Sequence, residues 1–372
     1  MPTIATLKQV KRALIDRHVR RDDMKGLGQV VLTLVPLGLL WVAAAWAADV
    51  AWWLVLPVVA AMSLFLLRSF VLMHECGHGS LFRTEPFNRA FGFLFGVVTG
   101  MPQYVWSRHH HHHHSTNGNW NRYRGPLNII PVDEYAAMSA REQRRYRNAR
   151  SIWLAPIAGF FYLIFNPRIN WLIGTVGLFL YVVQGKFAHP ETSLKTLATG
   201  FKTPYWASWQ EYRHMSLNNL VLVLACGAMA WAVGPTLFFL CWTVSLSVAG
   251  GAGIVLFTVQ HNFEHSYASH DEGWDYDRAA LEGTSFLVLP GWLNWFSANI
   301  AYHHVHHLSA RIPNYCLAQC HNEYQHLFTR VTRIRLSEIP GALRCILWDT
   351  RLRCIVSVAE YDRQRSVPVT GA

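Results

Sequence analysis

Charged side chains are scarce in this chain of 372 residues: Lys, Arg, Asp and Glu make up 15% of it, against roughly 25% of a soluble domain. Hydrophobic residues reach 52%, with a heavy aromatic load of sixteen Trp and twenty Phe. This composition argues against an ordinary soluble protein and favours one that lies in a membrane. The seven cysteines are odd in number and include no CxxC pair, so we expect them to be reduced and exclude a disulfide framework.

Long apolar runs occur in two pairs along the chain. The first pair covers residues 27–48 and 50–72, and the second covers residues 217–233 and 236–258. Each run approaches the roughly 20 residues that cross a bilayer, and the break within each pair allows only a tight turn. Each pair therefore predicts a transmembrane helical hairpin. A Gly- and Pro-rich stretch at 86–106 predicts an interfacial or re-entrant segment, and two apolar stretches at 151–165 and 169–184, separated at Asn166–Pro167, are short for a span.

The formal net charge of +11 lies mainly outside the apolar runs. Seven Lys or Arg precede the first run, and none lies in the turns at 49–50 and 234–235. Because positive charge collects on the cytoplasmic side of a membrane, we expect a cytoplasmic N-terminus and hairpins that return the chain there. The charge then requires no nucleic acid, whose binding would need a basic recognition element. We divide the chain into a basic cytoplasmic segment (1–26), a membrane domain (27–330) and an Arg-rich cytoplasmic segment (331–372).

Twenty histidines are an excess, and most of them fall in four tight clusters that begin at His74, His109, His261 and His303. His74 and His78, like His261 and His265, are four residues apart, so on a helix each pair shares one face. All four clusters lie on the predicted cytoplasmic side, where they can converge. So many imidazoles exceed the four ligands of a structural zinc site and suit two redox metal ions. We predict an all-α integral membrane protein of two transmembrane hairpins (about four spans), with interfacial helices and a cytoplasmic helical cap that holds a histidine-rich dimetal site.

The clusters resemble the three histidine boxes of the membrane fatty acid desaturases, HxxxH, HxxHH and HxxHH. The first box matches His74 and His78, the second fits His110, His113 and His114, and the third matches His303, His306 and His307. Within the run of six, His109, His111 and His112 are alternatives for the second box. In animal acyl-CoA desaturases an Asn and a His four apart complete the metal shell, and His261 and His265 have that spacing here. The stretches after the second box (117–126) and around the third (299–315) resemble bacterial Δ12/ω6-type acyl-lipid desaturases, and the resemblance covers roughly residues 27–330.

The resemblance implies a fatty acyl desaturase, which inserts a C=C double bond with O₂ at a non-haem centre of two Fe ions. The implied ligands are His74, His78, His110, His113, His114, His261, His265, His303, His306 and His307. The acyl substrate would be linked to lipid, CoA or acyl carrier protein. A cytochrome b5 signature His-Pro-Gly-Gly is missing, so electrons would come from a separate donor such as a ferredoxin. The resemblance to bacterial enzymes and the distribution of positive charge together predict a bacterial inner-membrane protein with both termini and the active site cytoplasmic.

Several roles and outcomes stay open at this point. An acyl hydroxylase or an acetylenase would use the same boxes, and a membrane metal-binding or transport protein would instead need ionisable residues along a path through the spans. The acids that could orient imidazoles through their second ring nitrogen are Glu75, Glu264, Asp271 and Asp275. The tryptophans that could line an acyl channel are Trp106, Trp292 and Trp295, with interfacial anchoring as their alternative role.

Overall fold

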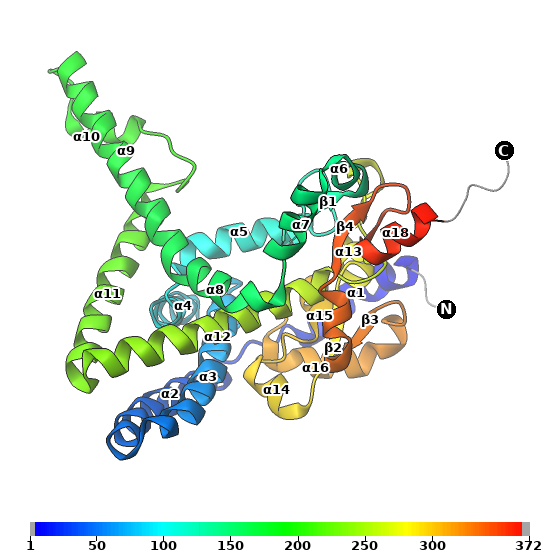
Figure 1. Cartoon of the computed structure of the whole chain (residues 1–372), viewed down its shortest axis with the longest axis horizontal. Coiled ribbons are helices and arrows are strands. Elements are labelled where there is room, and N and C mark those ends of the chain that lie inside the picture. Colours follow the sequence, from blue (N-terminus) through cyan, green and yellow to red (C-terminus); the bar gives the residue numbers. More distant parts are fainter. Residues whose placement is uncertain (1–3, 126, 367–372) are drawn as a thin grey trace.

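The computed structural model describes residues 4–125 and 127–366, most of which lie in helices (Figure 1). Five helical segments are long and apolar enough to cross a membrane. They are Asp23–Val50 (α2), Trp52–Gly77 (which includes α3, Val55–Gly77), Ile152–Ala188, Trp209–Val233 (α11) and Pro235–His261 (α12). The predicted hairpins are confirmed as α2–α3 and α11–α12, and with them the integral membrane fold class. The described residues thus contain five candidate spans, where the sequence predicted about four.

The additional span arises because the chain does not break at Pro167. Helix α8 (Ala155–Phe160), a π-helical turn (Phe161–Phe165) and α9 (Asn166–Ala188) follow one another directly. Proline lacks the N–H that would bond the carbonyl of Leu163 one turn earlier. The guanidinium of Arg168 donates to this carbonyl at 3.1 Å instead, so the helix continues where the sequence predicted an interruption.

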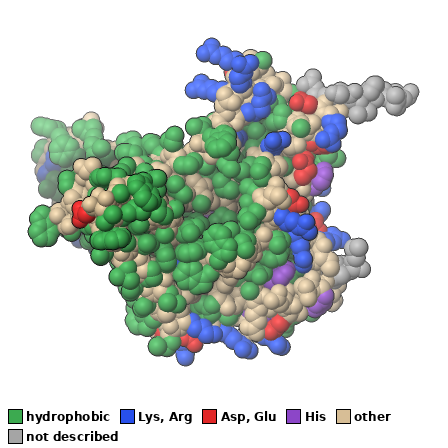
Figure 2. Space-filling view, turned by 60° about the horizontal axis from the view of Figure 1, so that its bottom comes forward, with side chains coloured by type: hydrophobic (Ala, Val, Ile, Leu, Met, Phe, Trp, Pro, Cys, Tyr) green, Lys and Arg blue, Asp and Glu red, His purple; other side chains and the backbone are tan. Residues whose placement is uncertain are grey.

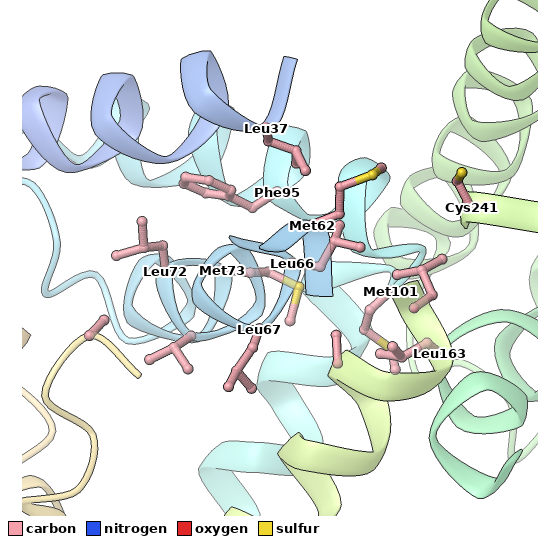
Figure 3. Close-up of a cluster of buried hydrophobic side chains, with 14 of the residues drawn as sticks. Leu37, Met62, Leu66, Leu67, Leu72, Met73, Phe95, Met101, Leu163 and Cys241 are labelled. Carbon is pink, nitrogen blue, oxygen red and sulfur yellow. The ribbon is translucent and has the colours of Figure 1, made fainter. Parts of the chain in front are cut away.

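Helix α3 lies at the centre of the packed membrane part. Its side chains Met62, Leu66 and Met73 are buried. Figure 3 shows them near Leu37 of α2 and Phe95 of α4 (Glu85–Thr99), which belong to the same apolar cluster. The core therefore joins the first hairpin to the segment that follows it in sequence.

Helices α8 and α12 approach each other through glycines. A Cβ atom added at Gly159 of α8 would overlap the backbone of Gly250 and Gly251 on α12. Small residues at such crossings let helix backbones come close within a membrane. This contact packs α8 against α12, and together the two helices form a wall of the cavity described below.

The outer faces of the spans are apolar and exposed. Figure 2 shows a broad hydrophobic surface with Lys and Arg gathered at its edges. Leu39 and Trp46 of α2 are 63% and 67% exposed, and Trp231 of α11 is 89% exposed. A continuous apolar surface of this kind is compatible with contact to lipid hydrocarbon, and the helices satisfy their own backbone groups as that environment requires.

A polar cap on one side of the spans contains both ends of the described chain (Figure 1). Its helices include α1 (Ile4–His18), α13 (Tyr276–Glu282), α15 (His303–Leu308), α16 (Asn314–Tyr324) and α18 (Val358–Ser366). Lys8 of α1 pairs with Asp275, and Lys11 lies 2.5 Å from Asp277. The N-terminal helix is thus held against the segment after α12.

The cap is not wholly helical, which differs from the prediction. Strands β1 (Ile130–Pro131), β4 (Cys345–Asp349) and β5 (Cys354–Ser357) form one sheet in the order β1-β4-β5, and β2 (Ser285–Val288) pairs in parallel with β3 (Thr332–Arg335). The side chain of Trp348 in β4 is fully buried and stacks on Trp120 with ring centroids 4.1 Å apart. Pairing between segments so distant in sequence gives no local apolar signal, and these short strands were missed. The other helices are α5 (Gln103–Thr116), α6 (Val132–Ala137), α7 (Ala140–Ala149), α10 (Leu194–Gly200), α14 (Gly291–Phe296) and α17 (Ile339–Ala342).

A buried arginine links three helices at the base of this cap. Arg68 of α3 is 3% exposed and donates to Thr33 Oγ1 at 3.0 Å and Gln29 Oε1 at 3.1 Å, both on α2. It also donates to the carbonyl of Trp295 in α14 and lies 3.9 Å from the centre of that indole ring. Within residues 4–125 and 127–366, no carboxylate forms an ion pair with it. Its charge is therefore held by neutral oxygens and an aromatic face.

Candidate metal centre

Four helices carry the histidine clusters to the boundary between spans and cap. His74 lies in the last turn of α3 and His78 caps it, α5 carries the run of six, α12 ends at His261, and α15 begins at His303. Gly77 lets α5 approach α3 closely, because a Cβ atom there would overlap the hydroxyl of Ser107. The local sequence thus brings the first two boxes together.

Nine imidazoles converge in two groups, in each of which one nitrogen per ring lies within 4.8 Å of the others. The five-histidine group contains His74, His78, His110, His114 and His306. The four-histidine group contains His113, His261, His303 and His307. The structure therefore brings together nine of the ten residues that the sequence suggested as ligands.

Spacing of the ring nitrogens fits metal coordination. Neighbouring Nε2 atoms are 2.9 Å apart in the pair His261–His303, 3.0 Å in His110–His114 and 3.3 Å in His74–His78. At a metal–imidazole bond length of about 2.0–2.1 Å, adjacent ligands lie about 2.9 Å apart in octahedral and about 3.3 Å apart in tetrahedral geometry. The donor atoms are thus already at ligand-to-ligand distances, and the donor set fits two metal ions.

The six consecutive histidines lie on different faces of helix α5. His110, His113 and His114 are buried and face the other clusters, whereas His109, His111 and His112 are exposed. His111 Nδ1 lies 2.8 Å from the carbonyl of Ser107 on its own helix. The structure thus brings His110, His113 and His114 into the histidine groups described above and leaves the alternatives His109, His111 and His112 out of both.

His265 lies outside both groups. The helical relation expected between His261 and His265 does not exist, because α12 ends at His261 and Asn262 is extended. His265 adopts a positive φ of 64°, its backbone N–H bonds the carbonyl of Ile355, and its side chain is exposed. The HxxxH spacing predicted that both histidines share one face of a helix, but the helix ends between them. Only His261, the first of the pair, belongs to one of the two groups.

Burial favours the neutral form of several clustered imidazoles. It lowers the pKa of His110, His113 and His114 well below the ordinary 6.5, and neighbouring imidazoles lower it further. The same causes lower the pKa of His303 and His307. A neutral imidazole keeps the lone pair that a metal ion needs. The site can therefore bind a cation without first releasing protons from these rings.

A cavity of about 850 Å³ ends at the histidines. Its walls are mostly apolar side chains of α3, α8, the π-helical turn after α8, and α12, among them Leu66, Phe70, Ile157, Phe161 and Phe257. His74 and His110 of one group and His113 and His303 of the other also line it. The volume is typical of ligand sites, roughly 300–1,000 Å³, and the lining suits an apolar chain.

Trp106 connects the cavity wall to a clustered histidine. Its indole stacks on the imidazole of His110 with centroids 4.5 Å apart, and its Nε1 donates to the hydroxyl of Tyr162 at 3.0 Å. Of the three tryptophans named from the sequence, Trp106 lines this cavity; Trp292 is 59% exposed, and Trp295 contacts Arg68. Tyr162 was missed, since it lies in an apolar run without any local signal of function.

Among the four acids suggested as orienting groups, one touches a clustered histidine. Oε1 of Glu75 lies 3.0 Å from Nδ1 of His74. Glu264 instead faces Cys345 and Ser357, Asp271 pairs with Arg122, and Asp275 pairs with Lys8.

Comparison with known proteins agrees with this geometry. The model of the family "Fatty acid desaturase" matches residues 51–336. A fatty acid desaturase of Bacillus subtilis (strain 168) is 32% identical over 369 residues, which cover 99% of this chain and 95% of the relative. A chloroplastic omega-6 fatty acid desaturase of Arabidopsis thaliana is 22% identical over 98% of this chain and 72% of its own length. An sn-1 oleoyl-lipid 12-desaturase of Anabaena variabilis is 24% identical over 86% of this chain and 81% of its own length.

Proposed function

The chain belongs to the fatty acid desaturase family, a class of oxidoreductases, and from this premise we propose that it inserts a C=C double bond into a fatty acyl chain with O₂ as co-substrate. One observation carries the proposal: nine imidazoles converge on two centres at the end of an apolar cavity of about 850 Å³. The five-histidine group would hold one iron ion and the four-histidine group the other. We leave His265 out of this ligand set because its side chain is exposed and outside both groups.

When bound, the iron pair supplies the O₂ chemistry that removes hydrogen from an unactivated methylene, which protein acids and bases cannot do. The protein holds the acyl chain and excludes water. Phe70 and Phe257 flank the cavity, and Phe257 packs on His113 with ring centroids 5.0 Å apart. An acyl chain in the cavity would therefore lie beside residues of both groups.

We further propose a lipid-linked acyl chain that enters from the membrane. Ile157 of α8 and Phe161 of the π-helical turn that follows it line the cavity and are also 69% and 50% exposed. A chain could thus pass between lipid and cavity at this wall. The similarity to a relative named as an sn-1 oleoyl-lipid 12-desaturase supports this carrier over CoA or acyl carrier protein.

Electrons would come from a separate donor such as a ferredoxin. The exposed α7 carries Arg141, Arg144, Arg145 and Arg147, which suits an acidic partner. Positive charge of this kind also supports a cap, with both termini, on the cytoplasmic side of a bacterial inner membrane.

Expression in a host without polyunsaturated lipids, together with a ferredoxin and its reductase, tests the proposal. Fatty acids profiled by gas chromatography and mass spectrometry should contain a product two hydrogens lighter than its precursor. His303→Ala should abolish it, whereas His326→Ala, at an exposed histidine outside both groups, should retain it. A hydroxylated or triple-bonded product would assign the hydroxylase or acetylenase alternative, and an unchanged profile would reject the proposed reaction.

A further inference from the structure

We propose that Glu75 is a positioning residue that orients the imidazole of His74 in the five-histidine group and sets the metal affinity of that group alone. The inference rests on the proposed metal centre and extends it to a residue outside the ligand set. Glu75 is fully buried, at 0% exposure, at the end of α3.

The two oxygens of Glu75 have separate tasks. Oε1 lies 3.0 Å from Nδ1 of His74 and 3.9 Å from Nδ1 of His306, so it faces one ligand from α3 and one from α15. Oε2 accepts from the hydroxyl of Ser80 at 2.8 Å and from the backbone N–H of Asn314 at 3.1 Å. The two bonds to Oε2 fix the carboxylate, and Oε1 can then orient the ring of His74, while His306 faces it from beyond hydrogen-bond distance.

An acceptor at Nδ1 determines which nitrogen of the ring carries the proton. With its N–H directed at Glu75, His74 turns the lone pair of Nε2 toward the centre, where Nε2 of His78 is 3.3 Å away. In the same group, Nε2 of His306 lies 3.1 Å from Nε2 of His114. A carboxylate behind a ligand imidazole also makes the imidazole a stronger donor.

The charge of Glu75 also indicates that a cation binds in the five-histidine group. Across the described parts of the chain, Glu75 pairs with His74 and His306 but with no Lys or Arg. Arg68 reaches it only through Gln29 and Asn314, whose side chains bond each other at 2.7 Å. A fully buried carboxylate is costly without compensation, and a divalent ion in the five-histidine group would supply it.

The four-histidine group lacks an equivalent acid. In the described residues no carboxylate lies within 4.0 Å of a ring nitrogen of His113, His261, His303 or His307, whereas Glu75 lies that close to His74 and His306. Glu264 follows His261 in sequence, yet its carboxylate contacts the thiol of Cys345 and the N–H of Ser357. Glu264 is therefore a matched control, and loss of the Glu75 charge should affect one group of the two.

Cobalt(II) titration of the purified full-length protein in detergent tests the inference, because its visible absorption reports nitrogen ligation independently of turnover. Wild type and Glu264→Gln should bind two ions. Glu75→Gln should bind one of them 10–100-fold more weakly, the usual loss when such a partner is removed, and keep the affinity for the other. Ser80→Ala, which removes one bond to Oε2, should weaken the same ion by a smaller factor, and it decides the matter if Glu75→Gln does not fold.

The outcomes separate the two proposals. If Glu75→Gln binds two ions with wild-type affinity, or if its affinity for both ions falls equally, the proposed role of Glu75 is overturned and the desaturase proposal stays intact. Two ions in wild type, with one selectively weakened but no desaturated product in cells, would support Glu75 and reject the proposed reaction. A wild-type protein that binds no cobalt would reject both.

Discussion

Removal of metal should make this protein sensitive to mild acid. Seven buried histidines outside the spans have a pKa held well below 6.5 by burial: His110, His113, His114, His303, His304, His306 and His307. In the unfolded chain they regain the ordinary pKa of 6.5. The folded state thus binds fewer protons than the unfolded state below that pH. Their contribution to stability is present above pH 6.5 and is lost as the pH falls below it.

The size of the effect follows from linkage. While the folded rings stay neutral, each histidine costs about 1 kcal/mol of unfolding free energy between pH 6.5 and pH 5.5. Seven such rings give an upper limit of about 7 kcal/mol, within the roughly 5–15 kcal/mol that stabilises a whole domain. With an unfolding entropy of about 2.1 cal/mol/K per residue, this corresponds to a fall in Tm on the order of 10 °C.

Thermal melting followed by tryptophan fluorescence measures this fall in the chelator-treated protein at pH 7.5, 6.5 and 5.5. The metal-loaded protein should melt at a higher temperature at each pH, because an ion that binds only the folded state adds stability. His326→Gln, at an exposed histidine, should leave the pH dependence unchanged. A metal-free Tm that is constant from pH 7.5 to pH 5.5 would refute the reasoning, since buried neutral imidazoles cannot avoid this proton linkage.

Three further experiments probe the site and its walls. His261→Ala should remove iron from the four-histidine group and abolish product, whereas His265→Ala should keep activity within about twofold; iron analysis and fatty acid profiles of both variants check this. Gly159→Ala places a methyl group against the α12 backbone and should destabilise by about 1–3 kcal/mol, while Gly28→Ala, with no atom within 4 Å of the added carbon, should melt like wild type. Gly253 lines the cavity in open space, so Gly253→Leu should shift chain-length preference toward shorter acyl chains by about tenfold, and an unchanged preference in mixed-substrate assays would argue against this cavity as the acyl site.

The sequence predicted those parts that have a regular local pattern. Runs of apolar residues identified α2, α3, α11 and α12, and the spacing of histidines identified the residues of both groups. The path through Pro167 could not be predicted, because Arg168 replaces the lost backbone bond from the side. His265 was misplaced because the position of a helix end depends on what the chain meets next, here the carbonyl of Ile355.

Other parts depend on contacts between distant segments. The strands β1 and β4 pair across more than two hundred residues, and neither is long enough to be recognised alone. Four acids were equally plausible as orienting groups until the fold showed which one lies behind a ring. Glu75 and Glu264 both lie beside a clustered histidine in sequence, and tertiary structure alone separates their roles.

The network around Arg68 has a consequence for the order of biosynthesis. Its partners Gln29 and Thr33 are made before it, but Trp295 follows 227 residues later. At about 5–20 residues per second, the ribosome needs roughly 10–45 s to cover that distance. The first hairpin must therefore enter the membrane while Arg68 still lacks its contacts with Trp295. His306 is likewise synthesised about as long after His74. Metal can be captured in full only as synthesis nears its end, so nascent chains halted before α15 should be metal-poor and open to quality-control proteases.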